Sequence, residues 1–350
     1  MDMSQSFGDP KRYYARPTHI GSQTASSAII DSTEEMIRDL LVQRHRDLRE
    51  RVESTYKRQN PIIRELLTKH TALRLSADTS RQHVAVRVVD GLPEPLAQVV
   101  ETIPQREIWE LILNHSLLQS TVAGLEFTDQ RLNAIAAWQH ISNTTELSTA
   151  LSRSREFISW LAETLERTEI LDRLARIDED VLGAYFFHNQ PPTIQIYWMA
   201  IGIFAALQDT SVESLTVVTL AHELAHAFTH IGYDTDRQQW DTRAFSKTDP
   251  RIAEGLAQFY TEIVCQEFDE KNFGTGCSEA FNKLLRQQQS PYTCFRNWVG
   301  NATKRQEIIR SCLIQCRTDQ LTDYHNFEAS LQEAAQRIDR KTKSRMLHIR

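Results

Sequence analysis

The segment from Thr210 to Gly232 most constrains the fold, because it predicts a helix that is apolar on nearly every side. Thr210 followed by Glu213 predicts a capping box at its start, and Gly232 predicts a left-handed stop at its end. The apolar residues between them are Val212, Leu215, Val217, Val218, Leu220, Leu224 and Phe228. A helix that is apolar all round is buried. We therefore expect this helix at the centre of the protein.

Three ionisable side chains lie in the middle of this helix, at His222, Glu223 and His226. Burying such groups costs free energy unless they bind something. Residues four apart project from the same face, so His222 and His226 can direct imidazole nitrogens at one metal ion. Glu223 lies on the flank of that face, where it can take a proton from a metal-bound water. The alternative is that the two histidines and the acid are core residues paired with one another.

A second predicted helix, which begins at Asp249, supplies a third candidate ligand. Asp249 is a preferred N-cap residue, and Pro250 suits the first helical position. Glu254 lies opposite the apolar stripe of this helix, which consists of Ile252, Leu256, Phe259 and Ile263. Catalytic zinc keeps three protein ligands and one open position, so we predict Zn2+ bound by His222, His226 and Glu254. A favourable interaction of Glu254 with the helix dipole is the alternative role.

Together the two motifs resemble the gluzincin clan of metallopeptidases, in which two histidines come from one helix and a glutamate from the next. The resemblance rests on His222-Glu223-Leu224-Ala225-His226 and on Ala253-Glu254-Gly255-Leu256-Ala257-Gln258-Phe259-Tyr260, and it covers about 193–268. It implies a core of a small sheet, whose edge strand lines the substrate cleft, followed by the two helices. It also implies zinc ligation by His222, His226 and Glu254, with Glu223 as the general base on a zinc-bound water in peptide-bond hydrolysis.

Some positions depart from this resemblance and leave alternatives open. Gln258 stands where some gluzincins carry an aspartate that orients a ligand histidine. His230 extends the histidine spacing by one further turn, which is similar to ImmA/IrrE-type regulatory peptidases, but the residues around Glu254 do not match that family. Asp234 and Asp236 are competing ligands, although the signature that surrounds such an aspartate in Asp-zincins is missing.

The sequence does not single out the residue that stabilises the oxyanion. His188, His230, Tyr233 and Arg251 are all candidates. For His230 we favour another role, because a histidine in the last turn of a helix commonly caps the free carbonyls there.

We expect a predominantly helical α+β fold with a zincin-like catalytic core. Residues 1–30 are expected to form a flexible N-terminal arm and 31–177 a helical N-terminal region. Residues 178–350 are expected to form the zincin-like catalytic region, with a helical C-terminal part. Helical periodicity in the second region is predicted to break near Gly124–Thr128 and near 142–145.

Other segments predict the strands and boundaries of the fold. The β-branched run 83–89 predicts a strand, and the segments 182–187 and 193–198 predict a hairpin around a Pro-Pro turn. Three prolines in 91–104 predict a connector, and Asn60-Pro61 predicts the start of a new helix.

Composition narrows the partners and the compartment. The net charge of −6 gives no electrostatic reason to expect nucleic acid or an anionic membrane as partner. The longest apolar stretch, 194–207, is too short to cross a bilayer, and the N-terminus lacks the order of a secretory signal. The five cysteines form no tight CxxC pairs, which favours a reducing, cytoplasmic setting.

We therefore expect a selective intracellular zinc peptidase that acts on protein or peptide substrates. Two other classes of function stay open. One is a regulatory or interaction protein whose zinc site is structural or degenerate, with His230 or Asp236 as a fourth ligand. The other is a zinc hydrolase of a small molecule, which would have a closed pocket.

Overall fold

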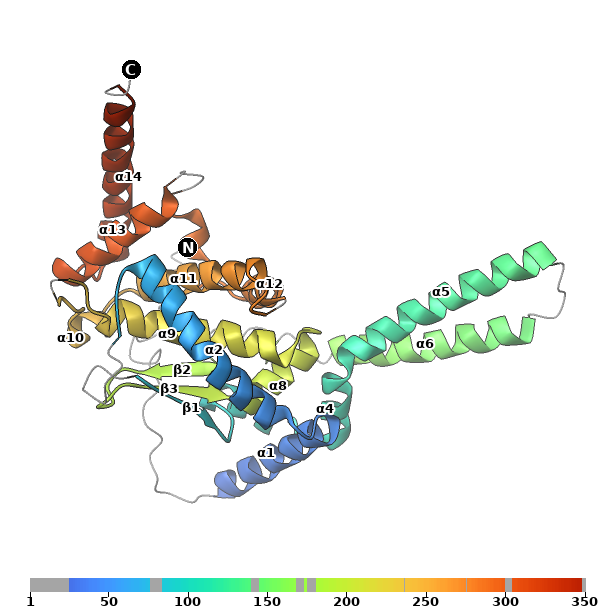
Figure 1. Ribbon diagram of the computed structural model, residues 1–350. Helices are drawn as coiled ribbons and strands as arrows, with labels where there is room; N and C mark the ends of the chain where they lie inside the picture. Colours follow the sequence, from blue (N-terminus) through green and yellow to red (C-terminus); the bar gives the residue numbers. More distant parts are fainter. Residues whose placement is uncertain are drawn as a thin grey trace, which may run out of the picture.

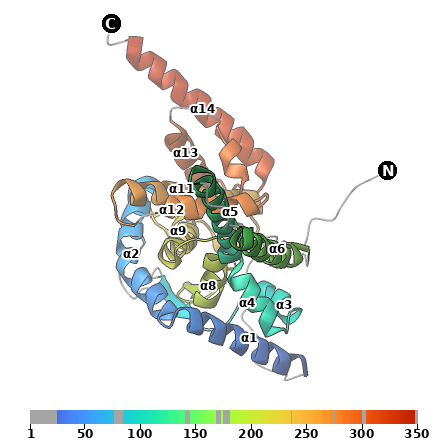
Figure 2. The same ribbon diagram turned by 90° about the vertical axis from the view of Figure 1, so that its right-hand side faces the viewer.

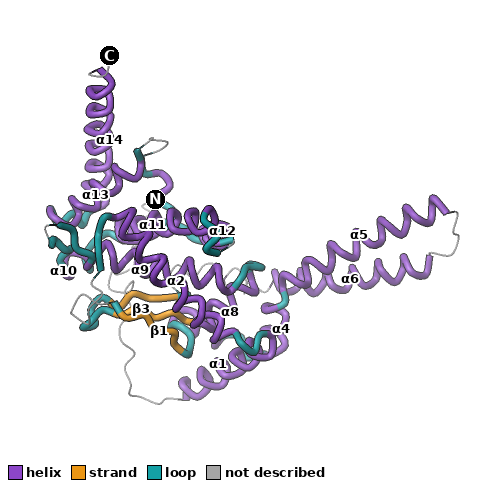
Figure 3. The backbone as a smooth tube through the Cα atoms, viewed as in Figure 1, coloured by secondary structure: helices purple, strands orange, loops and turns teal. Residues whose placement is uncertain are grey.

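The computed structural model describes residues 25–75, 84–139, 145–167, 173–174, 181–235, 237–274, 276–299 and 304–347. These residues form a predominantly helical fold with one small sheet (Figures 1 and 3), which confirms the expected α+β class. Residues 1–24 of the predicted arm lie outside the described residues, whereas 25–30 belong to the first helix.

Helices account for most of the described chain. They are α1 (Ala25–Arg44), α2 (Leu48–Thr71), α3 (Glu94–Glu101), α4 (Arg106–Leu113), α5 (His115–Gln139), α6 (Thr145–Arg167), α8 (Trp198–Leu207), α9 (Val212–Ile231), α10 (Thr242–Phe245), α11 (Pro250–Glu270), α12 (Cys277–Gln287), the short 3-10 helix η2 (Cys294–Asn297), α13 (Arg305–Thr318) and α14 (Tyr324–Leu347). The strands are β1 (Ala85–Val89), β2 (Gly183–Phe186) and β3 (Thr193–Tyr197).

Helix α9 is the centre of the fold, as its all-round apolar sequence predicts. The sheet lies on one side of α9 and helices α11 and α12 on the other, while α2 crosses it (Figure 1). Every residue of α9 except Glu213 is buried. Helices α2 and α11 make the most extensive contacts with α9 and complete its enclosure.

The start of α9 differs by one residue from the predicted capping box. The hydroxyl of Ser211, rather than that of Thr210, accepts the hydrogen bond from the backbone N–H of Ser214, at 3.0 Å. Glu213 does not complete the box. Its carboxylate accepts two hydrogen bonds from the Arg51 guanidinium on α2, at 2.8 and 3.0 Å, and so joins α2 to α9.

The end of α9 also differs from the prediction. Gly232 has a φ of −55° and a ψ of 142°, so the predicted left-handed stop is wrong. A Cβ atom at this position would lie 2.3 Å from the carbonyl oxygen of Phe228, and the glycine therefore permits a close approach of two backbone segments.

The three strands have the order β1-β3-β2. Strands β2 and β3 pair antiparallel, with Gly183 opposite Ile196, which confirms the predicted hairpin. Strand β1 pairs parallel with β3 and thereby brings a strand from the predicted N-terminal region against the predicted catalytic region. The observed strand is shorter than the predicted one at 83–89. Strand β1 begins at Ala85, and His83 lies outside the described residues.

Several predicted boundaries in the N-terminal half are wrong. Helix α2 continues through Pro61, and the chain turns before Leu48 instead. The expected connector contains helix α3. Pro93 is at the N-cap of α3 and Pro95 in its first turn, where no intrahelical N–H is needed. Helix α5 continues through Gly124–Thr128. Of the second expected break, 142–144 lie outside the described residues and helix α6 begins at 145.

Helices α5 and α6 form an antiparallel hairpin that projects from the body of the molecule (Figure 1). In Figure 2 the hairpin is seen nearly end-on, in front of the helices around α9. Across the described residues, no helix has both the length and the apolar character that crossing a membrane requires.

Candidate metal centre

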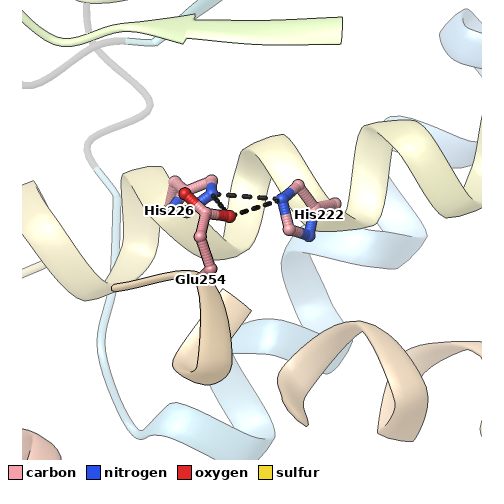
Figure 4. A group of neighbouring side chains, drawn as sticks. All are labelled: His222, His226 and Glu254. Atoms are coloured by element: carbon pink, nitrogen blue, oxygen red, sulfur yellow. Dashed lines mark hydrogen bonds and ion pairs between the residues drawn. The ribbon is translucent and has the colours of Figure 1, made fainter. Parts of the chain in front are cut away.

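Three side chains converge between α9 and α11, and Figure 4 shows them pointing toward one another. The Nε2 atoms of His222 and His226 lie 3.1 Å apart. The Oε2 atom of Glu254 lies 3.3 Å from His222 Nε2 and 3.2 Å from His226 Nε2. The three residues form the single group of potential metal ligands found within the described part of the chain.

The local sequence explains how Glu254 reaches the histidines. The carboxylate of Asp249 accepts the backbone N–H of Arg251, at 2.9 Å, and Pro250 occupies the first helical position, so α11 begins as predicted. Glu254 lies in the second turn of α11, on the side that packs against α9. Its side chain is only 5% exposed.

The donor atoms fit a zinc ion in number, type and spacing. Ligands bound to tetrahedral zinc at about 2.0–2.1 Å lie about 3.3 Å from one another. The three observed separations, 3.1, 3.2 and 3.3 Å, match this spacing. Two imidazole nitrogens and one carboxylate oxygen are also a ligand set found in hydrolytic zinc sites.

Electrostatics favours an ionised carboxylate at this position. Burial by itself raises the pKa of Glu254, but the charge of His226 and hydrogen bonds from both imidazoles outweigh it and lower the pKa to about 2. A buried anion facing two imidazoles is costly unless a positive charge compensates it. A divalent cation coordinated by all three side chains would supply that charge.

Glu223 does not belong to the converging group. It lies on α9 next to His222, is 1% exposed, and borders the same cleft as His222. Strand β2 approaches it closely at Gly183, where an added Cβ would meet Thr219 Cγ2 at 2.7 Å and Glu223 Cγ at 3.0 Å. A glycine at this point of β2 therefore lets the edge strand lie against the helix turn that carries Glu223.

A cleft of about 630 Å³, part of it open to solvent, lies beside these residues. Its polar lining near the metal centre is His222 and Glu223. Its walls are mostly apolar and comprise Val181, Leu182, Phe204, Val218, Phe281 and Leu284, with the amides of Gln258, Gln287 and Gln288. The Gln258 amide donates to Gln288 Oε1, at 3.2 Å, so its side chain is directed into the cleft wall and not to a ligand histidine.

His230 is buried away from the converging group. Its Nδ1 lies 3.1 Å from the Tyr185 hydroxyl, its Nε2 lies 3.2 Å from Thr242 Oγ1, and its ring stacks on Phe245. Burial is the main cause that lowers the pKa of His230 to about 3, with the positive charge of His188 adding to it. We predicted that His230 caps free carbonyl groups at the end of α9. Its two ring nitrogens instead contact the hydroxyl groups of Tyr185 and Thr242.

The other predicted site residues are dispersed. Asp234 Oδ1 accepts the backbone N–H of Gln238 and stabilises a loop, and Asp236 lies outside the described residues. The Arg251 guanidinium pairs with Asp249 at 2.6 Å and stacks over Tyr324.

The two remaining oxyanion candidates do not border the cleft. The ring of His188 lies 3.9 Å from that of Phe187, between centroids. Tyr233 forms a backbone bridge with Arg74. Neither is among the residues that border the cleft.

Sequence analysis missed one aromatic side chain near the centre. The ring of Tyr292 is buried, with its centroid 6.4 Å from that of His222. It follows α12 in an irregular segment, beyond the part of the chain that resembles gluzincins. No periodic pattern marks a residue in such a segment, so only the folded structure places it here.

Comparison with known proteins identifies no relative of this chain. The chain matches no family model, no curated protein and no solved structure, so its site is interpreted from its own residues and their geometry.

Proposed function

We propose that this protein is a zinc-dependent peptidase of the gluzincin type, with a zincin-like core formed by the sheet, α9 and α11. One observation carries the proposal: the three donor atoms of His222, His226 and Glu254 lie 3.1–3.3 Å apart beside a cleft that Glu223 also borders. The arrangement combines a ligand set for catalytic zinc with a buried carboxylate of the kind that serves as a general base.

Each side chain has a distinct role in this proposal. His222, His226 and Glu254 hold the ion, leaving the side toward the cleft for substrate. Zinc, when bound, polarises the scissile carbonyl and lowers the pKa of water toward neutrality. Glu223 accepts the proton of the attacking water and passes it to the leaving amine.

The neighbouring strand suits an extended peptide as substrate. Strand β2 is at the edge of the sheet, and it passes directly over the turn of α9 that carries Glu223. An extended chain can bind such an edge through backbone hydrogen bonds. The apolar cleft wall would then accept one apolar side chain of the substrate, because no lysine or arginine among the described residues borders it.

The two other classes of function are less well supported. A closed structural zinc site needs a fourth protein ligand, but His230 is held by Tyr185 and Thr242. No other potential ligand joins the group within the described residues, and Asp236, the other candidate, lies outside them. A small-molecule hydrolase is expected to enclose its substrate, whereas this cleft is partly open to solvent.

We also propose that the protein acts in the cytoplasm on one or few protein targets. All five cysteines are free thiols, and Cys265, Cys277, Cys312 and Cys316 are buried. Free thiols persist in a reducing compartment.

The experiment that tests the function compares the wild type with Glu223→Gln. Glutamine keeps the volume of the side chain but cannot accept the proton, so zinc content should persist while peptide hydrolysis falls at least about 100-fold. Zinc is measured by mass spectrometry of the purified protein, and cleavage by profiling the new N-termini produced in a cell extract. Cleavage that persists in Glu223→Gln would exclude Glu223 as the base, and lost zinc would make it a ligand.

A further inference from the structure

The projecting α5–α6 hairpin has the composition of a surface that something covers. Six of the nine large apolar side chains exposed in the described part of the chain lie on it: Leu117, Phe127, Ile135, Leu147, Phe157 and Trp160. Among the described side chains from 115 to 161, none is fully buried. Two helices share only one seam, and an apolar surface of this extent on a soluble domain marks an interaction site.

The seam between the helices sets the geometry of the hairpin. On α5 the partly buried residues include Leu118, Val122 and Leu125, which follow a spacing of three and four. The hydroxyl of Ser148 on α6 donates to Asp129 Oδ1 on α5, at 2.8 Å, and fixes which turns lie opposite each other.

Each helix carries a second, uncharged or nearly uncharged stripe beside this seam. On α5 the stripe is Leu117, Thr121, Gly124, Thr128, Arg131 and Ile135, and on α6 it is Leu147, Ala150, Ser154, Phe157 and Leu161. At about 100° per residue, both stripes lie roughly a quarter turn from the seam in the same sense about their own helix axis. In antiparallel helices, equal rotations of this kind lead to the same side of the hairpin. The stripes therefore form one continuous surface, which we call the stripe face.

The opposite face of the hairpin is different in charge. It carries the acids Glu126, Glu156 and Glu163. Among the residues of the two stripes Arg131 is the one with a charge, and Glu146 and Arg153 flank the stripe of α6. The hairpin is therefore amphipathic, although its seam is the one part that other described residues cover. A membrane is a poor partner for it, because the two helices carry six acidic residues against four arginines and would be repelled by anionic lipid.

The stripe face is close to self-complementary under a two-fold rotation. In each stripe, large side chains lie near the two ends and small ones in the middle. The small ones are Thr121, Gly124, Thr128, Ala150 and Ser154. A two-fold axis across the middle of the hairpin exchanges its ends, so small residues meet small residues and the helices can approach closely. At Gly124 an added Cβ would meet nothing within 4 Å, so space for a second helix is present there.

We propose that the stripe face binds the stripe face of a second copy of this chain, so that two hairpins form an antiparallel four-helix bundle. Two helices about 27 Å long and about 20 Å wide together bury on the order of 1,100 Å² in such a contact. This area is at the lower end for specific interfaces, which is typical of weak or transient association. The proposal is independent of the proposed peptidase activity.

The test is sedimentation velocity of the full chain over a hundredfold range of protein concentration. The wild type should pass from monomer to dimer. Phe157→Glu places a charge in the stripe face and should raise the dissociation constant by on the order of 100-fold. Thr149→Glu is the control for the added charge, because Thr149 is exposed and lies on the face of α6 that carries Glu156 and Glu163. It should dimerise like the wild type.

Ser154→Glu provides a second variant that removes no apolar side chain from the hairpin. Ser154 is exposed in the middle of the stripe face, so this substitution should also abolish the dimer while leaving the helix content in circular dichroism unchanged. A wild type that stays monomeric throughout, or a Thr149→Glu variant that loses the dimer equally, overturns the proposal. The face would be assigned to a membrane if the wild type stays monomeric but sediments with neutral lipid vesicles, and if Phe157→Glu abolishes this binding.

Discussion

The Nδ1 atom of His230 lies 3.1 Å from the hydroxyl oxygen of Tyr185 and ties the last turn of α9 to the middle of β2. His230 is one turn beyond His226 on the same helix, yet its other ring nitrogen contacts Thr242. Serving as a metal ligand would require one of these contacts to break, because a histidine coordinates through one ring nitrogen. The three histidines of α9 are thus divided between two tasks, since two converge with Glu254 and one holds the edge strand against the helix.

The first prediction concerns the pH dependence of stability. Burial keeps the pKa of His230 at about 3, whereas an unfolded histidine titrates near 6.5. Between these values the unfolded chain binds more protons, so this contribution to stability is complete above about pH 6.5 and is lost as the pH falls toward 3, at up to about 1.4 kcal/mol per pH unit. Urea unfolding of the chelator-treated protein at pH 5 to 7.5 measures it.

The control for this prediction replaces both partners of the hydrogen bond. Tyr185→Phe combined with His230→Phe removes the titrating group without leaving a buried hydroxyl unpaired. The free energy of unfolding of the double variant should vary less steeply between pH 7 and pH 5 than that of the wild type. Equal slopes would mean that His230 is protonated in the folded state or that its environment opens.

The second prediction distinguishes the ligand schemes. Glu254→Ala should remove zinc during dialysis against a mild chelator, because two imidazoles alone bind the ion weakly. Asp234→Ala should retain one zinc ion per chain, since Asp234 stabilises a loop through Gln238. Asp236→Ala tests the remaining alternative by the same measurement. Zinc lost from an aspartate variant and kept in Glu254→Ala would assign the site to the loop instead.

The sequence could predict the local parts of this site because they depend on short-range periodicity. The four-residue spacing of His222 and His226 places them on one face of any helix, and Asp249-Pro250 begins α11 as expected. The approach of Glu254 to the histidines depends on how α11 packs against α9. The sequence indicated Glu254 through its motif and its position on the wheel, but not the observed distances.

What the sequence could not predict depends on contacts far apart in the chain. The parallel pairing of β1 with β3 joins residues separated by about a hundred positions, and no local pattern marks such a partner. Helix α2 passes through Pro61, although proline in a helix interior costs about 3 kcal/mol. The buried face of α2 packs along α9, and that packing outweighs the local preference.

The third prediction tests the close approach of β2 to the general base. Gly183→Ala introduces a Cβ at 2.7 Å from Thr219 Cγ2 and 3.0 Å from Glu223 Cγ, so the strand or the Glu223 turn must shift. A displacement near 1 Å is expected to lower kcat by on the order of 100-fold while zinc content is unchanged. Gly124→Ala is the matched control, because an added Cβ there meets nothing.

A second substitution checks that the effect of Gly183→Ala is steric. Thr219→Ser removes the methyl group that the new Cβ would meet most closely. The double variant Gly183→Ala with Thr219→Ser should therefore recover part of the lost kcat. If recovery is absent while zinc and stability are normal, the loss arises from the strand backbone and not from this contact.

The last prediction concerns the side chain that the cleft accepts. Leu284 and Phe281 on α12 form part of its apolar wall, while His222 and Glu223 border the same space. Substrates that carry a leucine or phenylalanine next to the scissile bond should therefore be cleaved faster than those with a charged residue there, since an unpaired charge in this wall is costly. Leu284→Asp places a carboxylate in the wall and should shift the preference toward lysine and arginine. Competition between paired peptides that differ at this one residue measures the ratio of kcat/KM directly.

Zinc content serves as the control. Leu284 lies in the cleft wall and is not one of the three converging residues, so its replacement should leave the metal in place. An unchanged preference in Leu284→Asp would show that the substrate side chain binds elsewhere, whereas the proposed roles of Glu223 and the zinc ligands would stand on their own tests.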